Sequence, residues 1–306
     1  MRTKIKVVGV GGSGLNAVTR MKKIGLAGVE LMAINTDAQD LQKSKADFKL
    51  RIGRKLTQGL GTGMNPEIGR ESAKENRAEI EELLKGAEMV FIACGLGGGT
   101  GSGAAPVVAE ISKKLGALTV AVITRPFSFE GIFRKKIAES AEKLLKEKVD
   151  CLIAIENDKL LAVLDSKTTI LNAFWFCDDI LRQAVQGITD LILAPGLINV
   201  DFADIKTIMK NSGTALLGTA KARGEKRAEV AVKEALQSNL LTVSPKGARG
   251  VLFNVSGKDV SLAEIEEIGE IIRQEINPRA KIIFGAVTDQ KLKQGEIKVT
   301  IIATGF

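Results

Sequence analysis

The run Gly97-Gly98-Gly99-Thr100-Gly101-Ser102-Gly103 is the stretch of this sequence that most clearly suggests chemistry. It follows an apolar segment typical of a strand, 89–93, and precedes a segment typical of a helix, 104–115. Glycines and small hydroxyl residues leave backbone N–H groups uncovered at a helix N-terminus, where the amides and the helix dipole favour phosphate oxygens. A flexible linker is disfavoured because both flanks are apolar. Since no Gly-Lys-Ser/Thr follows, the run predicts a polyphosphate site that lacks a loop lysine.

A second glycine turn, Gly9-Val10-Gly11-Gly12-Ser13-Gly14, follows the first predicted strand and opens a helix. It matches the dinucleotide fingerprint G-x-G-x-x-G, and Asp37 after the next strand could bind a ribose. An NAD-dependent oxidoreductase is therefore one alternative. The other glycine run counts against it, because two glycine loops on one sheet suit a single polyphosphate held from two sides. A third turn, 59–66, also precedes a helix and could meet a terminal phosphate.

Phe174 and Asp178 lie four residues apart, which places them on one face of a predicted helix over 168–193. An aromatic ring could stack on guanine, and a carboxylate could accept hydrogen bonds from its N1–H and 2-amino group. Adenine has no donors at those positions, so an aspartate would select guanine. Spacing alone favours the alternative that Phe174 lies in the core and Asp178 is solvated.

The segment Asn199-Val200-Asp201-Phe202-Ala203-Asp204 follows Pro195-Gly196, which ends that helix. Taken alone, it favours Asp201 as a helix N-cap and Asp204 as an acidic first-turn residue. The functional alternative is that the two carboxylates position and polarise a water for attack on a phosphate.

The composition is that of an ordinary soluble globular protein: 306 residues, 45% apolar and 26% charged, without histidine. No apolar stretch approaches about 18 residues, so we expect no membrane insertion. The N-terminus shows no signal-peptide pattern and the three cysteines have no metal spacing, so we expect a cytoplasmic protein. The net charge of +8 is spread over scattered lysine pairs without interleaved aromatic residues, and we expect no nucleic-acid partner.

Short apolar strands alternate with helices in the first half, which favours an α/β fold with a parallel sheet covered on both faces. We predict a Rossmann-like domain over 1–167, a long central helix over 168–194, and a smaller α+β domain over 195–306. In the last part, Ser261 and Glu264 form a capping box that opens a helix.

Together these motifs resemble the tubulin/FtsZ family of GTPases, and within it the bacterial cell-division members. The resemblance extends from Lys4 to Phe306. The run Gly97–Gly103 resembles the family's GGGTG[TS]G signature, and Asn199–Asp204 reproduces NxDxxD. Five more matching segments follow the family's order: 35–39, 65–67, 126–131, 157–160 and 247–250. Ser128, Thr62, Met64 and Trp175-Phe176 depart from the usual residues.

The resemblance implies a role for each matching residue. Those expected near the phosphates and the sugar are Gly11, Gly12, Asn16, Asn35, Asp37, Gly98, Gly99, Thr100, Gly101, Ser102 and Gly103. Gly61, Thr62 and Gly63 would reach the γ-phosphate. Pro126, Glu130 and Arg134 would lie along the ribose and phosphate edge, and Asn157, Phe174 and Asp178 around guanine. Asn199, Asp201 and Asp204 would form the catalytic loop. GTP or GDP would be the ligand, with Mg²⁺ held mainly by phosphates and water, so no metal-ligating residue is expected.

The predicted helix is long enough to keep the residues expected around guanine apart from the acids of the catalytic loop. At about 1.5 Å per residue, roughly 20 helical residues span about 30 Å. The acids after the helix therefore cannot reach a nucleotide bound near its start, and we expect them to complete the site of a neighbouring copy. Such a heterologous contact propagates as a head-to-tail homopolymer unless it closes into a ring. With the resemblance, this predicts a Z-ring protein located at the division site, with other division proteins as possible partners.

Besides the oxidoreductase, two alternatives stay open. A non-catalytic GTP-binding scaffold would polymerise or bind partners without releasing phosphate. Tubulin-like relatives that segregate plasmids or shape cells share the active-site logic, although the motif set disfavours them.

Overall fold

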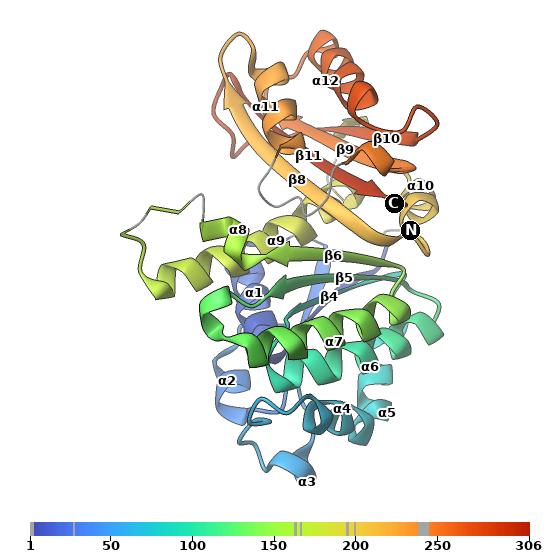
Figure 1. Ribbon diagram of the computed structural model, residues 1–306. Coiled ribbons are helices and arrows are strands. Elements are labelled where there is room, and N and C mark those ends of the chain that lie inside the picture. The colour runs from blue at the N-terminus through green and yellow to red at the C-terminus, as the bar shows by residue number, and fades with distance from the viewer. Residues whose placement is uncertain are drawn as a thin grey trace. The chain divides into compact units, whose positions relative to one another are not determined.

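The structure is a computed structural model that describes residues 3–26, 28–161, 164–165, 167–193, 196–198, 200–237 and 245–306. The chain divides into two compact units, Met1–Gln186 and Gly187–Phe306. The first contains a parallel sheet with helices on both faces, and the second is a smaller α+β unit (Figure 1). The long helix α9, Ile170–Leu193, runs without a break from one unit into the other. The predicted fold class is confirmed.

The strands of the first unit follow the order β3-β2-β1-β4-β5-β6, and every neighbouring pair is parallel. Their bounds are β1 Ile5–Val10, β2 Val29–Asn35, β3 Phe48–Arg51, β4 Met89–Gly95, β5 Leu118–Arg125 and β6 Cys151–Glu156. The inner strands are buried along almost their whole length because helices cover both faces, which explains their continuous apolar sequences. The order of strands reverses between β1 and β4. In open sheets of this kind, ligands bind at the carboxyl ends of the two strands at such a switch point.

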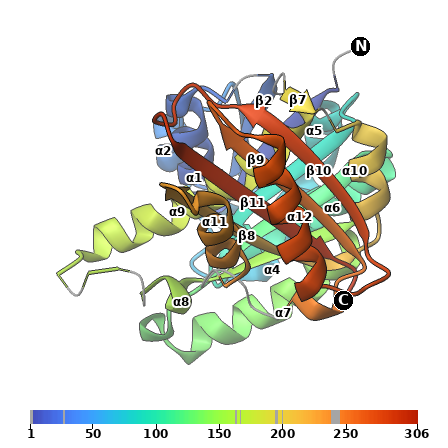
Figure 2. The same ribbon diagram turned by 90° about the horizontal axis from the view of Figure 1, so that it is seen from above.

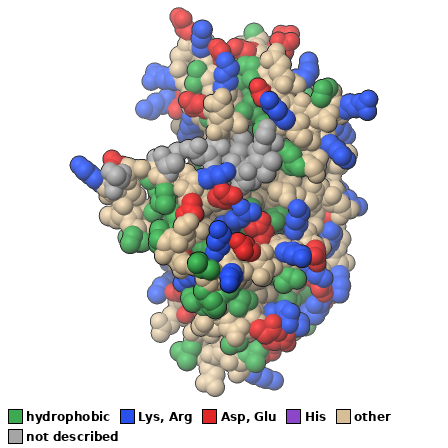
Figure 3. All heavy atoms as spheres, viewed as in Figure 1, with side chains coloured by type: hydrophobic (Ala, Val, Ile, Leu, Met, Phe, Trp, Pro, Cys, Tyr) green, Lys and Arg blue, Asp and Glu red, His purple; other side chains and the backbone are tan. Residues whose placement is uncertain are grey.

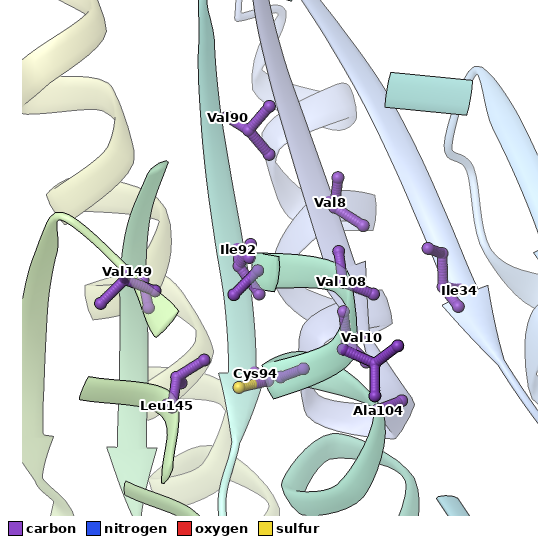
Figure 4. Packing of buried hydrophobic residues seen from close by; sticks show 14 of the residues in the cluster. Val8, Val10, Ile34, Val90, Ile92, Cys94, Ala104, Val108, Leu145 and Val149 are labelled. Carbon is purple, nitrogen blue, oxygen red and sulfur yellow. The ribbon is translucent and has the colours of Figure 1, made fainter. Parts of the chain in front are cut away.

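Helices of the first unit cover the sheet from both sides. Their bounds are α1 Gly11–Ile24, α2 Ala38–Lys43, α3 Arg54–Thr57, α4 Pro66–Glu75, α5 Arg77–Leu84, α6 Gly99–Lys114, η1 Ser128–Glu130, α7 Ile132–Lys148 and α8 Asn157–Leu161. On one face, Val8 and Ile92 of the strands pack with Val108 of α6 and Leu145 of α7 (Figure 4). A smaller cluster of Leu15, Ala33 and Leu41 packs α1 and α2 against β2.

The glycine-rich segments are more helical than the sequence predicts. Helix α1 begins at Gly11 and α6 at Gly99, so both helices include glycines that we expected in loops. The missing side chains allow close packing: a Cβ at Gly103 would lie 1.9 Å from the Pro66 carbonyl oxygen of α4, and one at Gly101 would lie 2.6 Å from the Gly95 carbonyl oxygen. Helix packing, rather than local propensity, therefore decides where these helices begin.

The helical segment after the third glycine turn consists of two helices, α4 and α5, separated at Asn76. The Asn76 side chain accepts a hydrogen bond from the Gly53 backbone N–H at 2.8 Å and donates one to Glu79 at 2.6 Å. The bond to Gly53, 23 residues away in the sequence, ties the junction of the two helices to the segment after β3.

In the second unit the strands follow the order β8-β11-β9-β10-β7. The elements are β7 Gly196–Ile198, α10 Phe202–Met209, β8 Gly213–Arg223, α11 Arg227–Leu236, η2 Pro245–Gly247, β9 Gly250–Gly257, α12 Leu262–Glu275, β10 Lys281–Thr288 and β11 Glu296–Thr304. Only β9 and β10 pair in parallel among the pairings described. Helices α11 and α12 pack together over β8, β9 and β11 (Figures 1 and 2), and their apolar side chains form one core cluster with those strands.

In this unit one local prediction is confirmed and one strand was not predicted. The capping box that opens α12 is confirmed: Ser261 Oγ accepts from the Glu264 backbone N–H, and the Glu264 carboxylate accepts from the Ser261 backbone N–H. Strand β8 was missed, because its sequence GTALLGTAKAR contains two glycines, three alanines and a lysine, which rarely indicate a strand. Its antiparallel pairing with β11 over Ala215–Arg223 makes it a strand.

Charged side chains of both signs are interspersed on the face shown in Figure 3. Such mixing is typical of a solvated surface. Within the described residues, no helix combines the length and the hydropathy that crossing a membrane requires.

Candidate nucleotide-binding site

A cleft of about 230 Å³ opens at the carboxyl ends of β1, β4, β5 and β6, at the switch point of the first unit's sheet. It brings together residues from glycine loops that are far apart in the sequence. The lining residues are Gly11, Gly12, Ser13, Thr62, Gly95, Leu96, Gly98, Gly99, Thr100, Gly101, Thr124, Pro126, Glu130, Arg134, Asn157, Phe174, Cys177 and Asp178. Ser13, Gly95, Leu96, Thr124 and Cys177 were not predicted. The first four of these lie within three residues of the carboxyl ends of β1, β4 and β5, and that position was the signal available in the sequence.

The two predicted phosphate loops touch each other at this cleft. Gly11 has a φ of +70°, and a Cβ there would lie 2.9 Å from the Gly101 backbone nitrogen. By contrast, a Cβ at Gly12 or Gly98 would have no atom within 4 Å. The walls are therefore close-packed backbone, whereas the cleft itself is open at the two positions where an anion would approach.

The third turn also reaches the cleft, through Thr62. A Cβ at Gly99 would lie 2.1 Å from Thr62 Oγ1, so only glycine allows this approach. Thr62 Oγ1 lies 3.5 Å from Thr100 Oγ1, which in turn lies 2.7 Å from Thr36 Oγ1. Met64 in the same turn has a φ of +62°, a left-handed conformation that costs a non-glycine residue about 1 kcal/mol.

A short polar segment forms the edge of the cleft beside η1. The Glu130 carboxylate accepts from the Phe127 backbone N–H at 2.8 Å and from the Arg134 guanidinium at 2.9 Å. Ser128 is also tied down, since the Asp158 carboxylate accepts from its backbone N–H at 2.8 Å and from its hydroxyl. These bonds keep Glu130 and Arg134 in place at the cleft.

Phe174, Asp178 and Asn157 form another part of the cleft lining. Phe174 is 38% exposed and meets the ring of Phe127 edge-on, with 5.4 Å between the ring centroids. Asp178 is only 7% exposed, so the exposures are the reverse of those that spacing alone favoured. Asn157 Oδ1 is buried and has no hydrogen-bond partner. This part of the lining therefore offers an aromatic ring and two buried oxygen acceptors.

Asp178 has a partner that the sequence did not predict. Arg20 of α1 donates to Asp178 Oδ2 at 3.3 Å, and its guanidinium lies 4.6 Å from the centre of the Trp175 ring. Arg20 and Asp178 are 158 residues apart in the sequence. No local pattern relates residues at that separation, so only the tertiary structure shows this ion pair.

Burial raises the pKa of Asp178 from its ordinary 3.8 to about 6, while the charge and hydrogen bond of Arg20 act in the opposite direction. An unfolded Asp178 loses its proton at lower pH than a folded one, so this group lowers stability progressively as the pH rises from about 4 to 6.

The substitution Asp178→Asn removes this titration. We compare the unfolding free energy of the nucleotide-free variant with that of the unchanged protein. This difference should shift in favour of the variant by about 1 kcal/mol between about pH 5 and pH 7.5. Urea denaturation at both pH values measures this, and a pH-independent difference would contradict it.

Several residues predicted for the site do not line the cleft, and the structure gives most of them another contact. Asp37 caps α2 by accepting from Gln39 and Asp40 backbone N–H groups. Ser102 Oγ accepts from the Gly97 backbone N–H at 3.0 Å and so stabilises the glycine run. The complete set outside the lining is Asn16, Asn35, Asp37, Gly61, Gly63, Ser102 and Gly103.

The two predicted catalytic acids belong to the second unit, on α10. Asp201 is the N-cap of this helix and accepts from the Ala203 backbone N–H at 3.2 Å. Asp204 is an exposed acid of the first turn. The capping geometry predicted from the sequence is present, and it leaves carboxylate oxygens on the surface. Asn199 lies outside the described residues.

A larger cavity, about 730 Å³, runs along α7 and shares Pro126 and Asn157 with the cleft. Its lining arginine, Arg125, is paired with Glu142 and Glu156 at 2.7 Å each. Size alone does not identify a functional site, and the predicted phosphate loops meet in the smaller cleft.

The cleft fits a nucleoside polyphosphate by two independent observations. Open space at Gly12 and Gly98 leaves room for phosphate beside bare backbone, next to the N-terminus of α6. The orphaned Asn157 Oδ1 and the buried Asp178 carboxylate need hydrogen-bond donors, which a base supplies. Residues that line one cleft therefore meet the requirements of both a phosphate and a base.

Comparison with known proteins agrees with this geometry. Residues 4–165 match the Tubulin/FtsZ family, GTPase domain, and residues 213–306 match the FtsZ family, C-terminal domain. The chain is 48% identical to an FtsZ from M. jannaschii solved as an empty dimer, with a TM-score of 0.96 over 100% of this chain and 89% of that chain. A point mutant of FtsZ from M. jannaschii is also 48% identical, with a TM-score of 0.95 over 99% and 91%. CetZ2 from Haloferax volcanii, solved as a GTPγS-bound protofilament, shares the fold at 22% identity, with a TM-score of 0.82 over 98% and 92%. The chain belongs to the tubulin/FtsZ family of GTPases.

Proposed function

We propose that this GTPase binds GTP in the cleft of one copy and hydrolyses it with the acids of the next copy, in a head-to-tail protofilament. The observation that carries the proposal is the continuity of α9. Phe174 and Asp178 lie in its first turns, and the acids of α10 follow its end. From Phe174 to the end of α9 at Leu193 the helix rises about 29 Å, which one triphosphate does not span.

Within the cleft, each group has a role that its contacts support. Backbone N–H groups of Gly98 to Gly101 and of Gly11 and Gly12 hold phosphate oxygens, and Thr62 faces the terminal phosphate. Glu130 and Arg134 contact the ribose and phosphate edge. Phe174 stacks on the base. Asp178 accepts from guanine N1–H and the 2-amino group, which adenine does not offer in that place.

Magnesium fits this site as an ion carried by the nucleotide. No cluster of three or more histidine, cysteine, aspartate or glutamate side chains suited to a metal occurs among the residues described. The hydroxyl groups of Thr62 and Thr100 line the cleft and would contact the hydrated ion. When bound, Mg²⁺ neutralises phosphate charge and aligns the terminal phosphate.

On the neighbouring copy, Asp201 and Asp204 orient and polarise the attacking water, and the NxDxxD motif assigns Asn199 to the same catalytic role. Capping of α10 does not compete with this role, because a carboxylate has about four acceptor positions and one backbone N–H uses one of them. The acids then act at the moment of in-line attack and not in nucleotide binding.

A site completed in this way requires a heterologous contact, which repeats as a filament unless the rotation closes a ring. The solved relatives include an FtsZ dimer and a CetZ2 protofilament, which is consistent with such a contact. We further propose a role in cell division at the division site, with division proteins as additional partners. The solved relatives come from the archaea M. jannaschii and Haloferax volcanii, so the proposal does not specify a bacterial source. We also propose that residues 1–167 act as the GTP-binding domain, 168–194 as the central helix and 195–306 as the domain that carries the catalytic loop.

Phosphate release and sedimentation, measured together across protein concentrations with GTP or ATP, test the proposal. We expect activity per molecule to rise steeply with concentration, with GTP only. Constant activity per molecule would place the whole site within one copy. Polymer without phosphate release would indicate a GTP-binding scaffold, and NAD binding that GTP does not compete for would restore the oxidoreductase alternative.

A mixing experiment tests the shared site directly. Copies with Asp204→Ala retain the cleft, and copies with Asp178→Asn retain the acids. If one copy completes the site of the next, an equal mixture contains about a quarter of contacts that join an intact cleft to intact acids. The mixture should therefore release phosphate faster than the mean of the two variants alone. Strict additivity would refute the shared site.

A further inference from the structure

We propose that Arg20 is a positioning residue for base recognition: from α1 it holds the Asp178 carboxylate of α9 ionised and aimed into the cleft, so that selection for guanine persists at neutral pH. This inference rests on the proposed function, in which Asp178 accepts hydrogen bonds from guanine. Arg20 itself is not among the residues that line the cleft.

Arg20 contacts one oxygen of the Asp178 carboxylate and leaves other acceptor positions free. Arg20 Nη2 donates to Oδ2 at 3.3 Å, and the Arg20 side chain is 20% exposed, whereas that of Asp178 is 9% exposed. A carboxylate offers about four acceptor positions on its two oxygens. One contact from Arg20 therefore fixes the orientation of the group and leaves acceptors for two donors of a base.

Trp175 holds Arg20 in this position from the other side. Its ring centre lies 4.6 Å from the guanidinium carbon, within the range of a cation–π interaction. Arg20 Nε is buried without a hydrogen-bond partner, which is an unfavourable arrangement for a guanidinium. The side chain is therefore placed by Trp175 and Asp178 and not by its own full set of hydrogen bonds. This also gives a role to Trp175, one of the residues that depart from the family's usual sequence.

Without Arg20, the Asp178 carboxylate would keep its proton to a higher pH. Burial, together with the weaker effect of the Asp179 charge, raises the pKa of Asp178 to about 6 even with Arg20 present. Of the other charged groups nearby, Asp179 is paired with Arg182, and Glu130 on the opposite wall is paired with Arg134. Arg20 is the cation that acts on Asp178 within the described part of the chain. A protonated Asp178 has one acceptor fewer and would meet guanine N1–H with an O–H donor.

The test compares GDP and ADP affinity of the whole protein from about pH 5.5 to 8.5, followed by the emission of Trp175, the single tryptophan. In the unchanged protein, we expect GDP affinity to fall as the pH drops through about 6. Arg20→Gln should move this fall upward by about one pH unit or more. At about pH 6, that shift lowers GDP affinity about fivefold or more and leaves ADP affinity unchanged.

Three further variants separate positioning from structural damage. Arg20→Lys keeps the charge and should restore the pH profile. Asp178→Asn should abolish the pH dependence, and adding Arg20→Gln to it should change nothing further. Arg182→Gln removes the ion pair to the adjacent Asp179, and it should leave the GDP profile in place.

The outcomes distinguish this inference from the proposed function. If Arg20→Gln matches the unchanged protein at every pH, or binds GDP more tightly, Arg20 does not position Asp178, and the proposed function is unaffected. If the unchanged protein shows no preference for GDP over ADP, the proposed function fails first. If Arg20→Gln does not fold, a pH titration of the unchanged, nucleotide-free protein tests the inference instead. Its Trp175 emission should titrate near pH 6 and should not titrate in Asp178→Asn; a flat profile in the unchanged protein would overturn the inference.

Discussion

Asp204→Ala is expected to lower the rate of GTP hydrolysis at least about 100-fold while leaving GTP affinity within about twofold. Asp204 is an exposed first-turn residue of α10, in the unit that does not contain the cleft. Its loss removes a carboxylate that acts only when a neighbouring copy docks, so turnover falls and nucleotide binding does not. Phosphate release at saturating GTP, together with equilibrium binding of GTP, measures both quantities.

The matched control is Glu229→Ala, which removes a first-turn acid from α11 of the same unit. Each change costs a favourable helix-dipole interaction of about 0.3–1 kcal/mol, so both proteins should unfold at nearly the same denaturant concentration. Only Asp204→Ala should lose turnover. A variant that hydrolyses GTP at the normal rate would remove Asp204 from the mechanism. Loss of GTP binding would instead place the residue in the nucleotide site of its own copy.

Gly99→Ala is expected to weaken GTP binding by about 100-fold or more and to lower the unfolding free energy by about 1–3 kcal/mol. The new Cβ would lie 2.1 Å from Thr62 Oγ1 and 2.8 Å from both the backbone nitrogen and oxygen of Asn65. A hydroxyl group can rotate away, but the backbone at Asn65 must shift. The turn that carries Thr62 would then move away from the first turn of α6, and the terminal-phosphate end of the cleft would lose its shape.

Gly269→Ala is the control for a glycine replaced within a helix. A Cβ there meets only Phe253, at 3.9 Å, in the interior of α12. This variant should gain about 0.5–1 kcal/mol of stability from helix propensity and bind GTP normally. Titration with GTP and urea denaturation measure the two effects. Normal GTP affinity in Gly99→Ala would show that close approach of the third turn is not needed for binding.

The parts of this protein that could be predicted are those that depend on neighbours in the sequence. Buried parallel strands are apolar along their length, so β1, β2, β4, β5 and β6 were all recognisable. The Ser261–Glu264 capping box satisfies backbone N–H groups within four residues, and its sequence pattern predicts it directly. Glycine runs directly after strands indicated which ends of the sheet carry the cleft, because parallel strands end at the same edge.

Residue types and their local spacing were therefore sufficient to predict the α/β class, five strands of the first unit and the chemistry of the glycine loops. Which distant groups meet followed only from the folded chain. It brings Gly11 against Gly101, makes β8 a strand by pairing it with β11, and buries Asp178 beside Arg20, although spacing alone favoured a solvated carboxylate. The physical reason is that burial and long-range packing depend on the whole fold, whereas helical and strand periodicity depend only on residues a few positions away.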